Sequence, residues 1–263
     1  MGKGQEEFDD DWEKNMEADV VKWDAAEGGE GNIEMDRAIG IEEVRVVVEA
    51  LKDRKAVGQD GIPAEAYKYG GEVMVQAITR LLGRMFHHGR IPKEWMRCTI
   101  FPIPKKIGTQ EVKNYRGISL VQVVMKVYGL VLLNRLKNFC KENGLLVDEQ
   151  FGFREKRGTR DALFVFNSVL REKRRKGLYV AYLDIKKAYP SVRRTAMWWQ
   201  LWKMGIRGKM WMVLKGLYEI MESCVVGDDK FLDFAIGLRQ GCVLAPFFLV
   251  VHERFGERDQ EES

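Results

Sequence analysis

The sequence predicts an α+β fold, and three observations lead to that prediction. Apolar residues recur at helical spacing in several segments, as Ile41, Val44 and Val48 do. Other short segments alternate β-branched and aromatic residues between turn signals, which is typical of strands. Helical patterns flank the most apolar strand candidate, residues 178–185, and the chain has no internal repeat, which favours mixed helices and strands.

Length and composition exclude several classes of protein. The 263 residues and the 46% hydrophobic content suffice for one large domain or two smaller ones. We expect no membrane partner, because no apolar run is long enough to span a bilayer and the N-terminus lacks the apolar stretch of a signal peptide. The four cysteines form no C-x-x-C pair and indicate reduced thiols of an intracellular protein, in the nucleus or the cytoplasm.

The charge is distributed unevenly along the chain. Residues 1–36 have a net charge of −10, whereas the remainder has a net charge of +14. The acidic segment has few apolar side chains and includes the linker-like EGGEGN (27–32), so we expect it to be disordered or loosely helical. The basic remainder is typical of a protein with a polyanionic partner, and a solvated charged surface is an equal alternative.

Ordered structure is expected from residue 37 onward. The spacing of apolar residues predicts helices over 41–51 and 72–86, and Gly and Pro residues end both. The segment 97–120 alternates like two short strands joined by an exposed, lysine-bearing loop. A long helix is expected over 122–142, ending before an Asn-Gly pair.

The second half of the chain combines the same two patterns. Its most informative residue is Asp184, a single carboxylate at the end of an apolar strand, where burial is costly unless the group is paired or binds a metal. The elements expected are a basic loop and helix (150–177), a buried strand (178–185), two helices (196–204 and 207–222), a strand–turn–strand unit (223–236) and a last helix or strand before the charged tail.

The triplet Gly227-Asp228-Asp229 lies between two apolar runs and has two interpretations. Adjacent carboxylates at a strand turn can hold Mg²⁺, which takes oxygen ligands in octahedral geometry. The same residues also suit a tight turn with no other role.

Six segments in a fixed order resemble a known family. They are GQDGIPAE (58–65), IPKEW and IFPIPKK (within 91–106), NYRGISL (114–120), QFGFREKRGTRDAL (150–163), YLDIKKAYPSV (182–192) and GLRQGCVLAP (237–246). Over residues 41–250 the chain resembles the reverse transcriptases of non-LTR (LINE-type) retrotransposons. Each segment is a weak signal, but six of them in the family's order and with its approximate spacing are specific.

The resemblance implies a right-hand polymerase fold with fingers, an incomplete palm and no thumb. After the acidic segment 1–36, residues 37–177 correspond to a fingers-like region, 178–250 to a partial palm and 251–263 to a charged tail. The family adds deoxynucleoside triphosphates to a DNA primer on an RNA template. Its reaction is a two-metal nucleotidyl transfer, for which Mg²⁺ is the expected cofactor.

Four residues match the family's catalytic and nucleotide-binding positions in the palm. Asp184 matches the first metal-binding, catalytic aspartate, and its alternative is a strand-end residue that caps the next helix. Tyr189 matches the steric gate whose ring excludes a ribose 2′-OH, a role that is compatible with ordinary core packing. Gln240 and Gly241 match the Arg-Gln-Gly turn beside the incoming nucleotide, where the Gln amide offers a donor and an acceptor.

Basic residues match the family's fingers. Arg116 and one of Lys105 and Lys106 resemble the residues that clamp the triphosphate, since Arg binds phosphate oxygens bidentately and Lys acts as a point charge. The resemblance leaves open which lysine is the counterpart, and a solvated loop is the alternative for both. The residues that match the template-contacting loop, where rings and guanidinium planes stack on bases, are Phe153, Arg154, Arg157 and Arg160.

The family's second metal-binding motif has no match in this chain. In the family, an aromatic-x-Asp-Asp hairpin follows the Arg-Gln-Gly turn, but after Gln240 the sequence contains only Asp259, in a polar tail. We therefore expect a domain truncated before this motif and inactive as a polymerase by itself; the alternatives are a catalytically silent nucleic-acid-binding remnant and a pseudogene product. Because the family's metal pair follows the turn, chain order favours a plain turn for Gly227-Asp228-Asp229.

Overall fold

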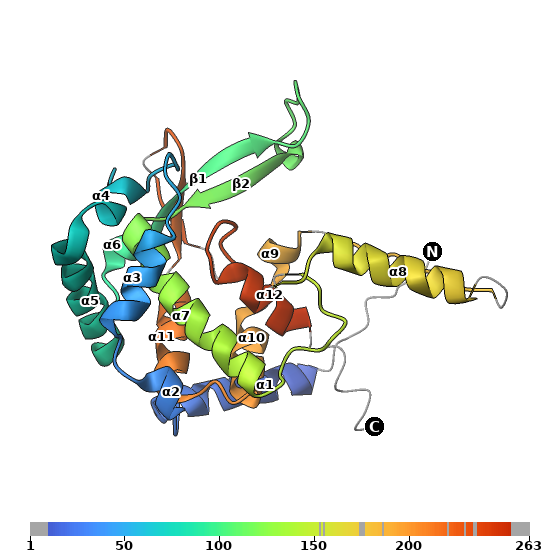
Figure 1. Ribbon diagram of the computed structural model, residues 1–263, viewed down its shortest axis with the longest axis horizontal. Coiled ribbons are helices and arrows are strands. Elements are labelled where there is room, and N and C mark those ends of the chain that lie inside the picture. Colours follow the sequence, from blue (N-terminus) through green and yellow to red (C-terminus); the bar gives the residue numbers. More distant parts are fainter. Residues whose placement is uncertain are drawn as a thin grey trace.

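The structure is a mixed α+β structure in which a small sheet projects in part from a body of helices (Figure 1). The computed structural model describes residues 10–152, 154, 156–173, 177–185, 187–219, 221–228, 230–233 and 236–253. The α-helices are α1 Asp10–Ala25, α2 Ile33–Asp36, α3 Ile41–Glu49, α4 Ala64–Lys68, α5 Gly71–His88, α6 Lys93–Met96, α7 Val123–Glu142, α8 Thr159–Lys173, α9 Ala188–Ser191, α10 Arg194–Lys203, α11 Gly208–Glu219 and α12 Ala245–Glu253. Among these described residues, no helix has both the length and the apolar character needed to cross a bilayer. The predicted α+β class is confirmed.

The sheet has four strands in the order β2-β1-β3-β4. The strands are β1 Arg97–Pro104, β2 Tyr115–Leu120, β3 Glu222–Val225 and β4 Leu232–Asp233. β1 and β2 form an antiparallel hairpin whose far end projects from the helical body (Figure 1). β1 runs parallel to β3, which pairs antiparallel with β4. The strand pairs predicted within 97–120 and 223–236 are therefore confirmed.

The turn between β3 and β4 explains why a Gly-Asp sequence occurs there. Gly227 has φ +85°, a conformation that favours glycine. The Asp228 carboxylate accepts a hydrogen bond from the backbone N–H of Lys230 at 3.0 Å, as aspartates at such turns do. The turn interpretation is confirmed for Gly227 and Asp228, while Asp229 lies outside the described residues.

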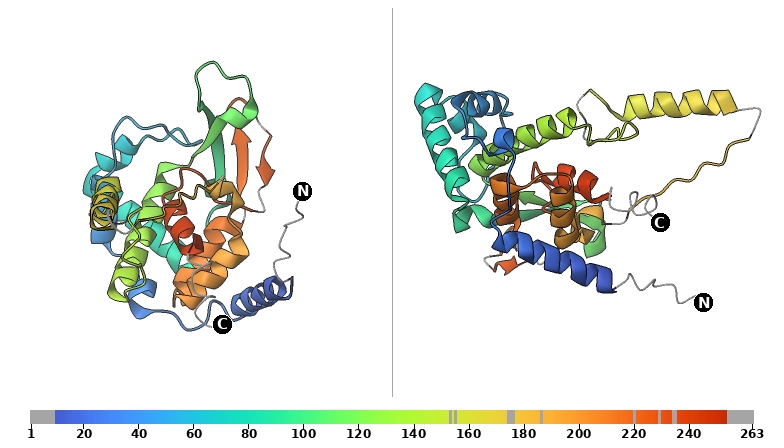
Figure 2. Two further views of the ribbon diagram at one scale, coloured as in Figure 1. Left: turned by 90° about the vertical axis from the view of Figure 1, so that its right-hand side faces the viewer. Right: turned by 90° about the horizontal axis from the view of Figure 1, so that it is seen from below.

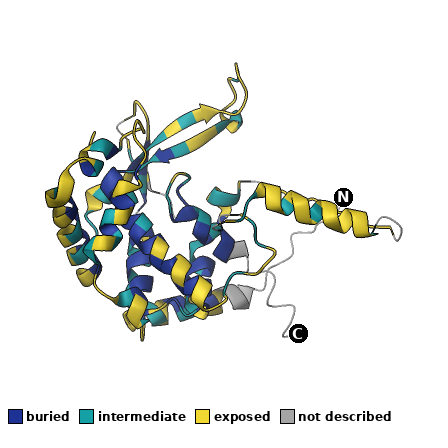
Figure 3. Cartoon of the chain, in the orientation of Figure 1, coloured by how far each residue is buried: buried dark blue, intermediate teal, exposed yellow. Residues whose placement is uncertain are grey.

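Helix α7 lies at the centre of the hydrophobic core. Most of its side chains are buried, and the buried ones lie on all faces of the helix, as expected for a helix that other elements surround (Figure 3). Helix α3 packs against it, and α5 packs against α3. The predicted helices over 41–51, 72–86 and 122–142 are thus confirmed as α3, α5 and α7.

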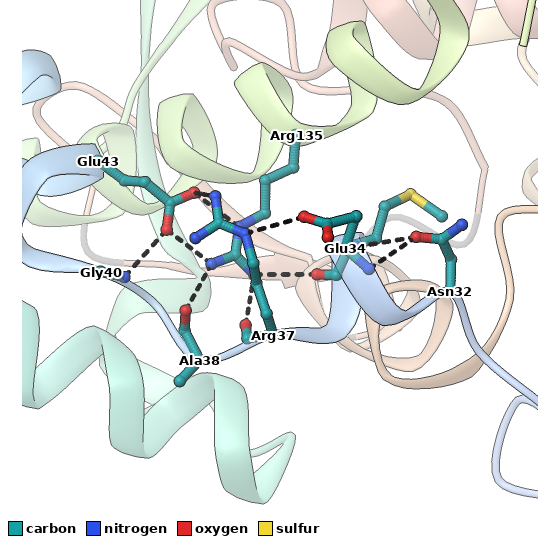
Figure 4. A network of polar contacts seen from close by, with 8 residues as sticks. Asn32, Glu34, Arg37, Ala38, Gly40, Glu43 and Arg135 are labelled. Carbon is teal, nitrogen blue, oxygen red and sulfur yellow. Dashed lines mark hydrogen bonds and ion pairs between the residues drawn. The ribbon is translucent and has the colours of Figure 1, made fainter. Parts of the chain in front are cut away.

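A buried arginine joins α7 to the N-terminal part of the chain (Figure 4). The Arg135 guanidinium donates to both Glu43 carboxylate oxygens, at 2.9 and 2.7 Å. It also donates to the carbonyl oxygens of Met35, Arg37 and Ala38 at 2.9, 2.7 and 3.0 Å. Because all of these acceptors face one cation, α7, α3 and the segment after α2 are held together.

Of the two expectations for residues 1–36, disordered or loosely helical, disorder is wrong for the part that the structure describes, which contains α1 and α2. Helix α1 packs against α10, with Met16 and Val20 buried. Trp23 stacks on Trp202 with the ring centroids 4.4 Å apart. These apolar residues recur at i, i+4 and i+7, so they share one side of the helix. The acidic composition of the segment concealed this single apolar stripe.

The predicted buried strand 178–185 is also wrong. Residues 177–185 form neither a helix nor a strand, and their side chains are exposed. Together with α8 they make an arm that extends from the body (Figures 1 and 2). A strand requires a neighbour for its backbone hydrogen bonds, and the arm keeps this segment apart from the sheet. We call α8 and residues 177–185 the arm below.

Candidate nucleotide and template site

The segment 237–241 lies between the sheet and the C-terminal helix α12. The backbone N–H of Ser119 on β2 donates to the carbonyl of Gln240 at 2.7 Å. The backbone N–H of Leu238 donates to the carbonyl of Tyr189 on α9 at 2.8 Å. The Arg-Gln-Gly turn is therefore bonded to the hairpin on one side and to the α9 segment on the other.

Two further side chains anchor this turn, and the sequence analysis missed both. Arg239 is buried, and its guanidinium donates to the carbonyl of Met96, next to β1. The hydroxyl of Tyr218 on α11 lies 3.2 Å from Sγ of Cys242 and donates to it. Burial, and then the neighbouring Cys242, raise the pKa of Tyr218 well above its usual value, so the hydroxyl stays protonated and remains a donor. Arg239 belongs to the recognised motif, whereas no sequence signal marks Tyr218.

Gly241 is required by the contact between the turn and β2. Its φ is +117°, a backbone conformation that residues other than glycine rarely adopt. A Cβ at this position would lie 2.6 Å from the carbonyl oxygen of Ser119, which is backbone and cannot swing away. Gly241 belongs to the recognised Arg-Gln-Gly motif, and its close approach to Ser119 is a packing reason for a glycine at this position.

The hairpin register separates the two candidate lysines. Arg116 lies opposite Ile103. The backbone N–H of Lys105 donates to the carbonyl of Asn114 at 2.7 Å, so the pairing continues one residue beyond β1. Because side chains alternate along a strand, Lys105 shares the face of Ile103 and Arg116, and Lys106 belongs to the opposite face. All three basic residues are exposed.

The basic residues of the hairpin lie farther along it than the contact with the Arg-Gln-Gly turn. Arg116 is three residues from Ser119 along β2, which corresponds to about 10 Å. Tyr189 is half-buried and packs against the hydrophobic core, as its alternative interpretation expected. The structure thus brings Tyr189, Gln240 and Gly241 together at the base of the hairpin, whereas Arg116 and Lys105 lie toward its far end.

Two arginines of the predicted template-contacting loop bind to other residues of the same loop. Arg154 donates to the carbonyl of Val147 at 2.6 Å. Arg157 donates to the Asp148 carboxylate at 2.8 Å, and its guanidinium lies 5.7 Å from the centroid of the Phe151 ring. These contacts hold residues 147–152 in place, so both arginines have a structural role in the described loop. Asp148 and Phe151 were missed by the sequence analysis.

The other two predicted template residues receive no such explanation. Arg160 is exposed in the first turn of α8. Phe153 lies outside the described residues. Their roles stay predictions.

Asp184 does not have the environment that the sequence predicted. It is exposed in the arm and not buried at the end of a sheet strand. In the part of the chain that the structure describes, no group of three or more His, Cys, Asp or Glu side chains is placed to hold a metal ion. A single exposed carboxylate does not fit a two-metal centre, which needs oxygen ligands to two ions about 3.5–4 Å apart.

A cavity of about 790 Å³ lies between the α1–α2 connection, the end of α5 and one side of α11. It contains none of the residues predicted from the sequence to bind nucleotide or template. One of its lining groups, the Asp36 carboxylate, accepts hydrogen bonds from the backbone N–H groups of Lys209 and Met210 at 3.1 and 2.8 Å. Asp36 therefore caps the first turn of α11.

Comparison with known proteins agrees with the recognised motifs. Residues 103–254 match the family model "Reverse transcriptase (RNA-dependent DNA polymerase)". The chain is 29% identical over 215 residues to the Retrovirus-related Pol polyprotein from type-1 retrotransposable element R2 of Nasonia vitripennis, which covers 80% of this chain and 20% of that protein. It is 28% identical over 216 residues to the RNA-directed DNA polymerase from mobile element jockey of Drosophila melanogaster, covering 80% and 23% of the two chains.

A third relative is a vertebrate protein. The chain is 26% identical over 216 residues to the Transposon TX1 uncharacterized 149 kDa protein of Xenopus laevis, covering 80% of this chain and 16% of that one. The chain thus matches about a fifth of the length of these relatives. Members of the matched family generally use divalent metal ions and bind a nucleic-acid template and primer. Because the family model covers more than half of the chain, the chain belongs to the reverse transcriptase family, among those of non-LTR retrotransposons.

Proposed function

We propose that this chain is the nucleotide- and template-binding part of an RNA-directed DNA polymerase. The supporting observation is the Arg-Gln-Gly turn, which is bonded through Gln240 to Ser119 and through Leu238 to Tyr189. These two hydrogen bonds unite three of the six recognised segments. In this proposal residues 37–177 are the fingers of a right-hand polymerase and residues 178–250 are part of its palm.

The proposed nucleotide site lies on the basic face of the hairpin. Arg116 and Lys105 share this face and bind phosphate oxygens of a deoxynucleoside triphosphate, the first as a bidentate donor and the second as a point charge. The Gln240 amide binds beside the base and sugar. The Tyr189 ring, held at the turn by its backbone bond to Leu238, excludes a ribose 2′-OH. The register supports Lys105, and not Lys106, as the phosphate contact.

The proposed template site is the loop that precedes α8. Arg154 and Arg157 order the loop by binding Val147 and Asp148. The exposed Arg160 then contacts phosphates of the RNA template, and Phe153 stacks on a base. Binding of this kind weakens as the salt concentration rises, because phosphate contacts release counterions.

Mg²⁺ is the divalent ion that we propose for the complete polymerase. It would supply charge stabilisation at the transferred phosphoryl group, with Asp184 as one of its oxygen ligands. In this chain Asp184 lies exposed in the arm. That position supports the expectation that the chain by itself does not extend a primer.

Binding to a DNA primer annealed to an RNA template tests the proposed contacts. We expect the affinity, measured by fluorescence anisotropy between 50 and 200 mM salt, to fall with increasing salt. Adding a deoxynucleoside triphosphate should stabilise the complex with the original chain more than the complex with Arg116→Ala or Lys105→Ala. Lys106→Ala is the matched control, because it removes the same charge from the other face. Equal losses for the Lys105 and Lys106 variants would contradict the assignment.

Primer extension distinguishes the enzyme from a silent binding remnant. With Mg²⁺ or Mn²⁺ present, we expect no template-dependent product from this chain, although the chain binds the primer–template. A product that Asp184→Asn abolishes would show that the chain assembles a working metal site. Loss of salt-dependent binding would instead favour a pseudogene product without a role in nucleic-acid binding.

A further inference from the structure

Helices α10 and α11 have the composition of a nucleic-acid-binding surface. Residues 193–218, which include α10 and all but the last residue of α11, contain six Lys or Arg residues, no Asp or Glu, and four of the seven tryptophans of the chain. Basic, aromatic surfaces suit single-stranded nucleic acid, because the cations follow the phosphates while the bases stack on the rings. Neither helix carries a nucleotide- or template-binding residue predicted from the sequence.

Two of these tryptophans have a basic side chain beside the ring. The Lys203 ammonium lies 4.9 Å from the centroid of the Trp199 ring. The Arg207 guanidinium lies 5.2 Å from the centroid of the Trp202 ring. Both cations are exposed, and both rings are half-buried. Each pair therefore places a charge next to a ring, as a nucleotide with its phosphate and its base requires.

Helix α1 covers this surface and brings a ring to it. α1 packs against α10 (Figure 2). The Trp23 ring lies parallel to the Trp202 ring, with the centroids 4.4 Å apart and an angle of 4° between the planes. Trp202 meets the buried Trp211 differently, edge-on with 79° between the planes. A parallel contact is also the way in which a nucleobase stacks on an aromatic side chain.

Helix α1 also brings anions to the surface. Residues 10–25 contain six Asp or Glu residues and two Lys. The Asp24 carboxylate forms an ion pair with Lys215 of α11. The Asp19 carboxylate accepts a hydrogen bond from the indole N–H of Trp199 at 3.3 Å. α1 thus presents a ring and carboxylates to α10 and α11, which are the counterparts of the base and the phosphates of a nucleotide.

The attachment of α1 allows it to open. Of the side chains that the structure describes in α1, only Met16 and Val20 are buried. The connection that follows contains Gly28 and Gly29 at φ +80° and +67°, and glycines give a hinge its freedom. The backbone N–H of Gly208 on α11 donates to the Gly28 carbonyl at 2.7 Å. The chain beyond Gly28 therefore stays attached when α1 swings away.

We propose that α10 and α11 form a second binding surface, for single-stranded nucleic acid, and that α1 mimics nucleic acid and covers this surface until an oligonucleotide displaces it. A base stacks on Trp202 in place of Trp23. Phosphates bind Lys203, Arg207 and Lys215 in place of the α1 carboxylates. The closed cover lowers the apparent affinity in proportion to the fraction of molecules that are open. The surface shares no residue with the hairpin or the template loop, so the proposal goes beyond the function proposed above.

Fluorescence anisotropy with a labelled oligouridine of about 12 nucleotides tests the cover. In the full chain, Trp23→Ala removes the stacked ring, and we expect the affinity to rise about tenfold because more molecules are open. Asp24→Asn is a milder change that keeps the packing of α1, and it should raise the affinity about threefold.

Two exposed positions of α1 supply the matched controls. Val21→Ala shortens an apolar side chain that is 67% exposed. Glu17→Gln removes the same charge as Asp24→Asn, from an exposed side chain. We expect both to leave the affinity unchanged. The proposal is overturned if Trp23→Ala and Asp24→Asn give no gain, or if the controls give the same gain.

Variants of the basic side chains locate the bound oligonucleotide. Combined with Trp23→Ala, each of Lys203→Ala and Arg207→Ala should lower by about one the slope of the logarithm of affinity against the logarithm of salt concentration. Arg160→Ala, at the proposed template site, should leave the gain from Trp23→Ala intact. If Arg160→Ala cancels the gain and the other two leave the slope unchanged, the oligonucleotide binds at the template loop and the proposal is overturned.

Hydrogen exchange distinguishes a displaceable cover from a fixed part of the fold. Adding oligouridine to the original chain should speed the exchange of the backbone amides of residues 14–25, while the amides of α7 stay slow. Unchanged exchange of α1 in the bound state would overturn the proposal. An RNA duplex of the same length should leave α1 slow, because its paired bases cannot stack on Trp202, and equal acceleration by the duplex would also overturn it.

Discussion

Helices α7 and α8 are both rich in apolar side chains, but α7 lies in the hydrophobic core and α8 lies in the exposed arm. Most of α7 is buried in the core, whereas α8 has no buried residue (Figure 3). Both helices form as the local pattern predicts, because helix formation depends on residues three and four apart. Burial depends on partners from elsewhere in the chain. α3 packs against α7, whereas α8 contacts the extended half of the arm through Phe166 and Tyr182.

Truncating a large side chain in the body and in the arm gives the sharpest test of this difference. Trp211 is fully buried, and its indole N–H donates to the carbonyl of Trp198 at 3.1 Å. We expect Trp211→Ala to lower the free energy of unfolding by about 3–5 kcal/mol. Phe164→Ala on α8, where the ring is 72% exposed, should change it by less than about 0.5 kcal/mol. Urea denaturation of both variants at monomeric concentrations measures the two values, and similar losses would remove the distinction between body and arm.

Arginines extend the same comparison to charged groups. Arg135 is buried between Glu43 and three backbone carbonyls, so Arg135→Ala leaves a partly buried carboxylate and these carbonyls without their donor. We expect a loss of about 3 kcal/mol in the free energy of unfolding. Arg160→Ala removes an exposed guanidinium from α8 and should have almost no effect on stability. The two variants are compared by urea denaturation, and a neutral Arg135→Ala would contradict the anchoring role.

The partner of Arg135 predicts a dependence on pH. Burial by itself raises the pKa of Glu43, but hydrogen bonds from Arg135 and from the backbone N–H of Gly40 outweigh it and hold the pKa below its usual value. A lowered folded-state pKa stabilises the fold above the unfolded-state value of about 4.3, and this contribution is lost as the pH falls through the folded-state pKa. Glu43→Gln should therefore cost about 1–2 kcal/mol near pH 7. The difference between the original chain and Glu43→Gln should shrink as the pH falls below 4, and denaturation at several pH values will detect it; a constant difference would contradict the ion pair.

The contact between the Arg-Gln-Gly turn and β2 predicts a loss of stability of intermediate size. Gly241→Ala combines a strained φ with a close approach to the Ser119 carbonyl oxygen, and we expect it to cost about 1–3 kcal/mol. Gly227→Ala is the matched control, because Gly227 also has a positive φ but has open space around it. Its cost should be limited to the backbone term of about 1 kcal/mol. Thermal unfolding compares the two variants. Equal losses of stability would mean that the close approach of Gly241 to Ser119 adds nothing to the cost of the substitution.

The smallest expected effect concerns a buried hydroxyl in the body. The Tyr128 hydroxyl is buried and has no hydrogen-bond partner among the described residues, whereas the Tyr218 hydroxyl donates to Cys242. Tyr128→Phe should therefore leave stability unchanged or raise it by up to about 1 kcal/mol, and Tyr218→Phe should lower it by about 1 kcal/mol. Tyr182→Phe in the arm, at an exposed position, should be neutral. A clear loss for Tyr128→Phe would point to an ordered water or another partner at its hydroxyl.

Local patterns predicted much of the fold and the order of the motifs. The helices α3, α5 and α7 follow from apolar spacing, and the β3–β4 turn follows from Gly227 and Asp228. Two predictions failed because they relied on average composition or on a local pattern, whereas the structure of these segments depends on contacts with distant residues. The acidic composition of residues 1–36 hid the stripe of Met16, Val20 and Trp23 that packs α1 on the body. The apolar run 178–185 has the composition of a strand but lacks a neighbouring strand.

The candidate site likewise combines residues that the sequence predicted with contacts that only the structure revealed. The resemblance predicted Arg116, Gln240 and Gly241 as site residues and left the choice between Lys105 and Lys106 open; the hairpin register puts Lys105 on the face of Arg116. No pattern in the sequence indicated that Ser119 bonds to Gln240, since these residues are far apart in the chain.

Helix and strand preferences, turns and motifs depend on neighbours in sequence and can be read from residue types. Burial of α1, exposure of the arm and assembly of the turn depend on which distant segments meet. That choice is made by packing and hydrogen bonding over the whole chain, so it became visible only in the folded molecule.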